Sequence, residues 1–169
     1  MGKPTYTVPR YRVRLVRDRQ VRYKATNPGD AAAILKTICC DDRGDRECMA
    51  VVYLDGGCNV IGCELVAMGG SHGLVVTSGE VLRGALLAGA RAIIIGHNHP
   101  SGDSTPSPED ITMTRAIARA GTVVGVEVAD HIVVTEWGHT SMRESLGEKF
   151  EELKQQQETG NVWSGKAER

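Results

Sequence analysis

The apolar run Ala92–Gly96, AIIIG, constrains the fold of this chain most strongly. Its β-branched residues do not alternate with polar ones, a pattern typical of a central strand that is buried on both faces. Two histidines, His97 and His99, follow directly at the end of this strand. Because residues two apart on a strand point to the same side, we expect both imidazoles to face one point in space.

A loop rich in proline, glycine and serine separates His99 from a predicted helix start at Ser107 and Asp110. We expect Asp110 to join the histidines, because two imidazoles and a carboxylate leave a fourth tetrahedral position for water, as in catalytic zinc sites. Asp103 in the loop is the rival ligand, but a helix would hold Asp110 more tightly. Ser107 and Asp110 also match a capping box, which explains both residues without any metal.

One carboxylate, Glu64, lies inside the apolar run Val60–Ala67. A carboxylate among residues that bury readily must be paired, lie on an exposed strand face, or be functional. The sequence leaves the exposed face and the functional role open. The rival carboxylate Glu80 is already explained, because it forms a predicted capping box with Thr77.

The remaining pattern predicts helices and strands in a mixed order. Helices are expected over Pro28–Ile38, from Thr77 to near Gly89, from Ser107 to Gly121, and as a surface helix from Ser141 onward. Strands are expected over Met49–Leu54, Val60–Val66, Val123–Val128 and Ile132–Thr135, the first two forming a hairpin. This order predicts one α/β domain with a central mixed β-sheet flanked by helices.

Composition narrows the class of protein further. The chain has 169 residues, of which 41% are hydrophobic and 24% charged, and its net charge of −1 indicates no global attraction to nucleic acid or membrane. Basic residues nevertheless dominate residues 1–24, and a predicted strand places Arg10, Arg12 and Arg14 on one face. That face is either a solvated edge that resists strand addition or a strip that contacts phosphates.

The cysteines and the hydropathy pattern predict where in the cell the protein is found. The five cysteines are an odd set without a CxxC pair, which favours reduced thiols in a cytoplasmic protein over a disulfide framework: Cys39, Cys40, Cys48, Cys58 and Cys63. The chain shows neither the apolar core of a signal peptide nor a segment long enough to span a bilayer. We therefore expect a cytoplasmic protein without a membrane partner.

The residues discussed above resemble a known signature. His97-Asn98-His99-Pro100, with Ser107, Asp110 and an upstream Glu64, resembles the JAMM motif of MPN+ (JAB) metalloproteases. More narrowly, HNHPSGDSTPSPED, the later DHIVV and the closing SMRE resemble the RadC family of bacterial JAB-domain proteins. The resemblance implies a JAB/MPN-type, cytidine-deaminase-like domain over residues 28–146, after a basic extension (1–27) and before a polar helix and tail (147–169).

The resemblance also implies chemical roles. His97, His99 and Asp110 would bind one Zn²⁺. Glu64 would deprotonate a zinc-bound water and pass the proton to the leaving amine, and Ser107 would stabilise the oxyanion. The implied activity is that of a zinc metallopeptidase or isopeptidase acting on a peptide or protein conjugate. His131 is either a partner of a metal-binding histidine or a plain histidine at a strand end.

Two other functions stay open at this point. Full-length RadC proteins carry a helix-hairpin-helix segment, and no such pattern precedes Pro28 here. The alternative function is a RadC-like binding module associated with DNA repair, with a structural or idle metal and DNA as a partner. Cleavage of a phosphodiester is less favoured, because this ligand set lacks the extra carboxylates of a two-metal site. The sequence does not identify the substrate or the oligomeric state.

Overall fold

The computed structural model describes residues 23–40, 46–69 and 74–155. The predicted arginine-rich strand around residues 10–14 lies outside this part of the chain. The described strands are β1 (Cys48–Leu54), β2 (Val60–Met68), β3 (Ala92–Asn98), β4 (Glu127–Val134) and β5 (His139–Ser141). The described helices are α1 (Pro28–Cys39), α2 (Ser78–Ala88), α3 (Pro108–Val124), α4 (Met142–Leu146) and α5 (Glu148–Lys154).

The strands form one mixed sheet in the order β2-β1-β3-β4-β5. Only β3 and β4 pair in parallel within this described sheet, and the helix α3 connects them. A parallel pair needs such a long crossover, whereas β1 and β2 need only the short turn after Leu54. The predicted α/β fold, with its mixed sheet and flanking helices, is therefore confirmed.

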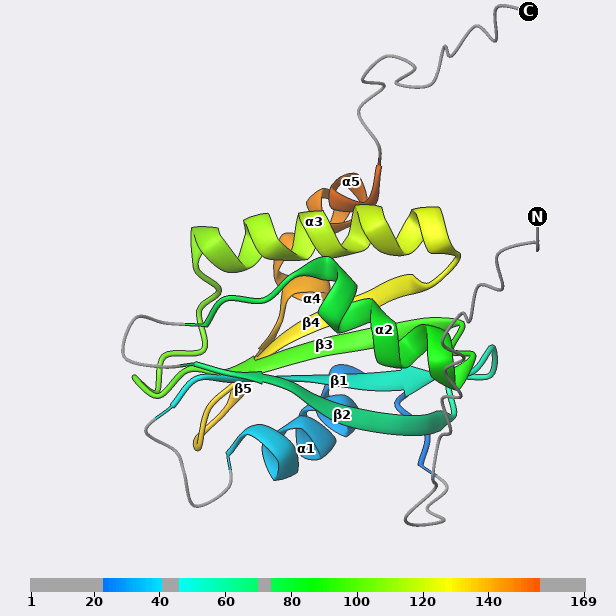
Figure 1. The fold of residues 1–169 in the computed structure, drawn as a ribbon. Coiled ribbons are helices and arrows are strands. Elements are labelled where there is room, and N and C mark those ends of the chain that lie inside the picture. Colours follow the sequence, from blue (N-terminus) through cyan, green and yellow to red (C-terminus); the bar gives the residue numbers. More distant parts are fainter. Residues whose placement is uncertain (1–22, 41–45, 70–73, 156–169) are drawn as a thin grey trace, which may run out of the picture.

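Helices cover both faces of the sheet (Figure 1). The helix α1 packs on one face, where Leu35 lies fully buried with strand residues such as Val52 and Ile132. The helices α2, α3 and α5 pack on the other face, over a core that includes Val51 and Ile95. All seven residues of β1 are buried, and so are residues 93–98 of β3, because helices cover both sides of these central strands.

A close approach of α1 explains the glycine at the end of the apolar run. A Cβ at Gly96 would lie 2.4 Å from Cδ1 of Leu35. A larger residue would clash with the buried Leu35 side chain, so the glycine lets α1 pack closely against the strand that carries His97.

Two predicted boundaries at α3 and β4 are wrong. The helix α3 passes through Gly121 and ends at Gly125, whose φ of 76° lies in the left-handed region that favours glycine. Gly121 instead leaves room for the turn that follows the helix. The Val126 N–H donates to the Gly121 carbonyl oxygen at 2.9 Å, and a Cβ at Gly121 would lie 2.4 Å from the Val126 carbonyl oxygen. The expected strands Val123–Val128 and Ile132–Thr135 are replaced by the single strand Glu127–Val134.

The region after His139 also differs from the prediction. His139–Ser141 form the short edge strand β5, which was not predicted. The expected surface helix is divided into α4 and α5 by Gly147, which has a φ of 55°. Phe150 and Leu153 are buried against the α3 side of the sheet, so α5 is a packed helix. None of the described helices is long and apolar enough to cross a membrane.

Candidate metal centre

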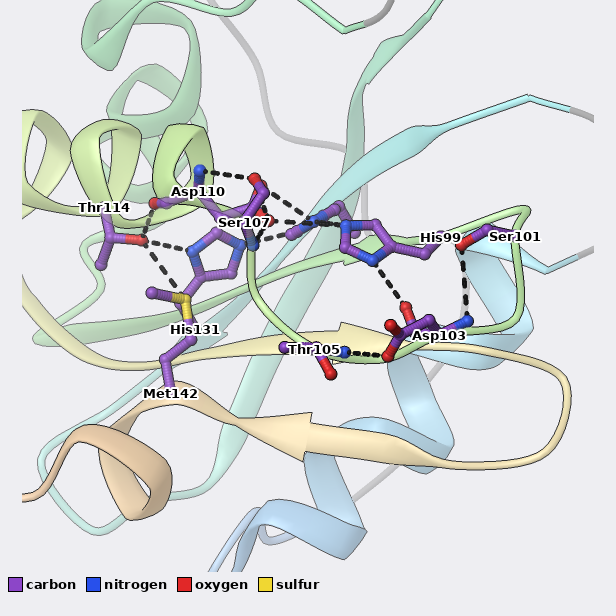
Figure 2. A network of polar contacts seen from close by, with 10 residues as sticks. His99, Ser101, Asp103, Thr105, Ser107, Asp110, Thr114, His131 and Met142 are labelled. Atoms are coloured by element: carbon purple, nitrogen blue, oxygen red, sulfur yellow. Dashed lines mark hydrogen bonds and ion pairs between the residues drawn. The ribbon is translucent and has the colours of Figure 1, made fainter.

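The three predicted ligands meet at the carboxyl end of β3. The Nε2 atoms of His97 and His99 are 3.0 Å apart, and the Asp110 Oδ1 atom lies 3.1 Å from Nε2 of His97. The other carboxylate oxygen lies 3.5 Å from Nε2 of His99. Figure 2 shows the side chains of His99 and Asp110 pointing toward each other, with Asp110 in the first turn of α3. His97 is fully buried and Asp110 is 5% exposed, so the protein shields these two ligands from solvent.

These separations fit ligands of one metal ion. Ligand atoms at 2.0–2.1 Å from a tetrahedral metal lie about 3.3 Å from one another. The observed separations of 3.0 to 3.5 Å bracket that value. Two imidazoles and a carboxylate are also the donor types that divalent zinc prefers, so the residues present fit such an ion.

A hydrogen bond to a carbonyl fixes the orientation of His99. Its Nδ1 atom lies 2.8 Å from the Asp103 carbonyl oxygen, which only accepts hydrogen bonds. Nδ1 therefore carries a proton, and Nε2 is the nitrogen that this ring can offer at the cluster. The side chain of the rival ligand Asp103 is used elsewhere, because its Oδ1 accepts from the Thr105 backbone N–H.

A chain of hydrogen bonds fixes His97 in the same way. The Thr114 hydroxyl donates to the Asp110 carbonyl oxygen at 2.6 Å, so it accepts from Nδ1 of His131, also at 2.6 Å. His131 is neutral, because burial and the neighbouring His97 hold its pKa well below the usual range. Its Nε2 therefore accepts from Nδ1 of His97 at 2.8 Å. Because Nδ1 of His97 carries a proton, Nε2 is the nitrogen that this ring can offer to a metal, and His131 acts as its partner.

Asp110 and Ser107 form the predicted capping box at the start of α3. The Ser107 backbone N–H and its hydroxyl both donate to Oδ2 of Asp110 at 2.7 Å. Burial acts to raise the pKa of Asp110, but the contact with His97 and the bonds from Ser107 outweigh it and hold that pKa well below the usual range. The carboxylate is therefore ionised and oriented before any ligand arrives.

A fourth group, Glu47, lies at the same cluster and was missed by the sequence analysis. Its carboxylate, His97, His99 and Asp110 offer ligand atoms that all lie within 4.8 Å of one another. Met49 pairs with His97 across the sheet, so the residue just before β1 lies at the end of the sheet where the histidines meet. Glu47 directly follows the charged stretch DDRGDR, so in the sequence it looks like one more charged residue of a surface loop.

Asn98 holds the backbone on both sides of Glu47. Its Oδ1 accepts from the Cys48 backbone N–H at 2.7 Å, and its Nδ2 donates to the Arg46 carbonyl at 2.9 Å. The carbonyl of Glu47 itself accepts from the Gly69 N–H at 2.7 Å. Asn98 is 3% exposed, so the residue between the two histidines is a buried clamp on this glutamate.

Glu64 does not reach the cluster. Across the sheet, Glu64 pairs with Val51 on β1, and Val51 pairs with Ile95 on β3. Glu64 therefore lies on the outer strand β2, level with a residue that is two positions before His97. Its carboxylate accepts a short hydrogen bond from the Tyr53 hydroxyl and lies 3.6 Å from a guanidinium nitrogen of Arg83. With 34% of its side chain exposed, Glu64 matches the paired and partly exposed alternative.

The surroundings of Glu64 explain this placement. Tyr53 is 5% exposed, and burial together with the Glu64 carboxylate keeps the pKa of its hydroxyl well above the usual range. A Cβ at Gly84 of α2 would lie 1.9 Å from the Tyr53 hydroxyl oxygen. The glycine therefore lets α2 close over the Tyr53–Glu64 pair, which joins β1, β2 and α2 at a distance from the metal ligands.

The fold and the site together define a class. A mixed sheet, a His-x-His pair at the end of a central strand and an aspartate on the next helix are the features of a JAB-type domain. The family model of the RadC-like JAB domain matches residues 25–148, and the chain belongs to this family. The resemblance predicted from the sequence is confirmed.

The chain is also similar to curated bacterial relatives that are named UPF0758 proteins. That of Salinibacter ruber is 38% identical over 133 residues, which cover 79% of this chain and 56% of the relative. That of Syntrophomonas wolfei is 35% identical over 132 residues, covering 77% and 56%. That of Symbiobacterium thermophilum is 46% identical over 94 residues, covering 56% and 40%. The chain thus spans about half the length of these relatives, and their names describe no activity.

Proposed function

We propose that the chain is a zinc-dependent hydrolase of the JAMM type that cuts a peptide or isopeptide amide in a peptide or protein-conjugate substrate. The observation that supports it is the convergence of His97, His99, Asp110 and Glu47 at one end of the sheet. The two histidines and Asp110 would hold Zn²⁺. When bound there, the ion polarises a carbonyl and makes water more acidic.

In this proposal Glu47 replaces Glu64 as the general base. A base must lie within hydrogen-bond reach of the proton that it takes, directly or through one water. Glu47 is half-buried at the ligand cluster, whereas Glu64 is occupied by Tyr53 and Arg83. Glu47 would take a proton from the attacking water and return it to the nitrogen of the leaving amine. The clamp by Asn98 would keep the carboxylate in place during both transfers.

Ser107 is proposed to donate a hydrogen bond to the oxyanion. Its single hydroxyl proton is directed at Oδ2 of Asp110 in this structure. The role in catalysis therefore requires the hydroxyl to rotate, while the Ser107 backbone N–H continues to hold the carboxylate. The DNA-binding alternative rests on arginines outside the described residues and stays a prediction.

Paired substitutions of the two glutamates test the proposal. We expect Glu47→Gln to keep its zinc and to lower turnover of a fluorescence-quenched peptide library by at least about 100-fold. The matched variant Glu64→Gln is expected to retain turnover within a few-fold, since its carboxylate serves the Tyr53 contact. Loss of turnover in Glu64→Gln with full activity in Glu47→Gln would reverse the assignment of the base.

A further inference from the structure

A second surface with ligand-binding features lies between α3 and the C-terminal helices. It is an open groove with a volume of about 750 Å³. Figure 1 shows α3 beside α5, with α4 close to both. Its lining includes three cationic side chains and one carboxylate, that of Glu152, together with apolar residues: Arg115, Arg119, Lys149, Ile111, Leu146 and Leu153. The three from α3 are four residues apart and so lie in one row along the helix.

The groove holds cations that form no ion pair with any described residue. Within the described part of the chain, no ion pair involves Arg115, Arg119 or Lys149, although Lys154 nearby pairs with both Glu127 and Glu151. The Nε atom of Arg119 is also buried without a hydrogen-bond acceptor among the described residues. A desolvated guanidinium nitrogen without an acceptor costs free energy, so a bound carboxylate that draws the Arg119 side chain into contact with it is stabilised.

Apolar side chains form the floor of the groove. Leu153 is 5% exposed, and Ile111 and Leu146 are partly buried against the core. A cationic rim over an apolar floor is complementary to a peptide that carries carboxylates and apolar side chains. A nucleic acid would bring phosphates to the rim but would leave the floor uncovered, so the observations favour a peptide.

The groove also begins beside the metal centre. Ile111, at one end of the row, directly follows the ligand Asp110, and the row continues along α3 to Arg119. The row therefore starts in the same helical turn that carries the ligand Asp110.

We propose that this groove binds an acidic segment with apolar side chains from a partner protein. The carboxylates of the segment contact Arg115, Arg119 and Lys149, and its apolar side chains cover Ile111 and Leu146. This binding goes beyond the proposed hydrolase function and does not require it, because none of the groove residues belongs to the metal-ligand cluster.

Fluorescence anisotropy with the full chain tests this inference. The probe is a fluorescein-labelled peptide of repeated Glu-Glu-Leu units. We expect saturable binding that weakens by at least about tenfold in Arg115→Glu with Arg119→Glu. If the charge-reversed protein does not fold, the milder double variant Arg115→Gln with Arg119→Gln replaces it and is also expected to bind the probe more weakly than the parent. Unlabelled peptides with Gln in place of Glu, or Ser in place of Leu, are expected to compete poorly.

A matched control separates the groove from general electrostatics. Lys24→Glu with Lys36→Glu makes the same change of charge outside the groove and is expected to leave affinity within about twofold. His99→Ala is expected to bind the probe like the parent, so this result is independent of the metal and of turnover. The proposal is overturned if the parent does not bind, if both charge-reversed pairs weaken equally, or if single-stranded DNA displaces the probe.

Discussion

Replacement of Thr114 by valine tests whether the hydrogen bonds behind His97 prepare its metal-binding nitrogen. Valine has nearly the same shape but lacks the hydroxyl that contacts His131 and the Asp110 carbonyl, both at 2.6 Å. Thr114 and His131 are 0% exposed, so no water replaces the lost acceptor. The Nδ1 proton of His131 is left buried and unpaired, which costs about 1–3 kcal/mol.

His131 can escape that cost only by moving its proton to Nε2. Nε2 would then donate to Nδ1 of His97, and the proton of a neutral His97 would occupy Nε2, the atom that faces Asp110 at 3.1 Å. Metal binding would have to reverse both shifts. We therefore expect Thr114→Val to lower zinc affinity by about 10–100-fold, or about 1.4–2.7 kcal/mol.

Competition between the protein and a chromophoric zinc chelator measures this change. Thr114→Ser keeps the hydroxyl and is expected to bind zinc within a few-fold of the parent, which makes it the matched control. Urea unfolding in the presence of EDTA reports the stability of each variant separately. If Thr114→Val binds zinc as tightly as the parent, the hydrogen bonds behind His97 do not set its metal-binding nitrogen.

Two further predictions concern Asn98 and Asp130. Asn98→Ala removes both hydrogen bonds that hold the backbone beside Glu47. Turnover is therefore expected to fall at least about tenfold while the zinc content stays at the parent's level. An equal loss of turnover and of zinc would contradict the role of Asn98 as a clamp on Glu47. Burial raises the pKa of Asp130 above its ordinary 3.8, so its contribution to stability decreases as the pH rises through the folded-state pKa. Asp130→Asn removes this charge and keeps an acceptor for the backbone N–H groups of His131 and Arg143. Its free energy of unfolding relative to the parent, measured in urea, is therefore expected to increase between about pH 4 and pH 7, and a constant or decreasing difference would contradict this.

Local signals in the sequence predicted much of the fold. The capping boxes at Thr77 and Ser107 and the hairpin of β1 and β2 all depend on residues close together in the chain. The end of α3 was misplaced because two glycines, Gly121 and Gly125, have different roles. The positive φ of Gly125 ends the helix, and the turn at Val126 approaches Gly121 closely; both glycines lie near the helix end, so the sequence does not show which of them ends it.

The metal site was predictable in part for the same reason. His97, His99 and Asp110 lie within 14 residues of one another, so strand and helix geometry could bring them together. Glu47 is 50 residues before His97 and reaches the cluster only through the pairing of β1 with β3. Glu64 looked chemically unusual among apolar neighbours, but its partner Tyr53 lies on the next strand. A pattern along one strand does not reveal such partners.

The zinc content per chain is the most direct test of the metal centre. The parent and His97→Ala are purified identically without chelator, and the metal in each is measured by mass spectrometry. We expect about one zinc per folded parent chain and none in the variant. Equal zinc in both proteins, or no zinc in either after zinc is supplied, would contradict the metal centre and the hydrolase built on it.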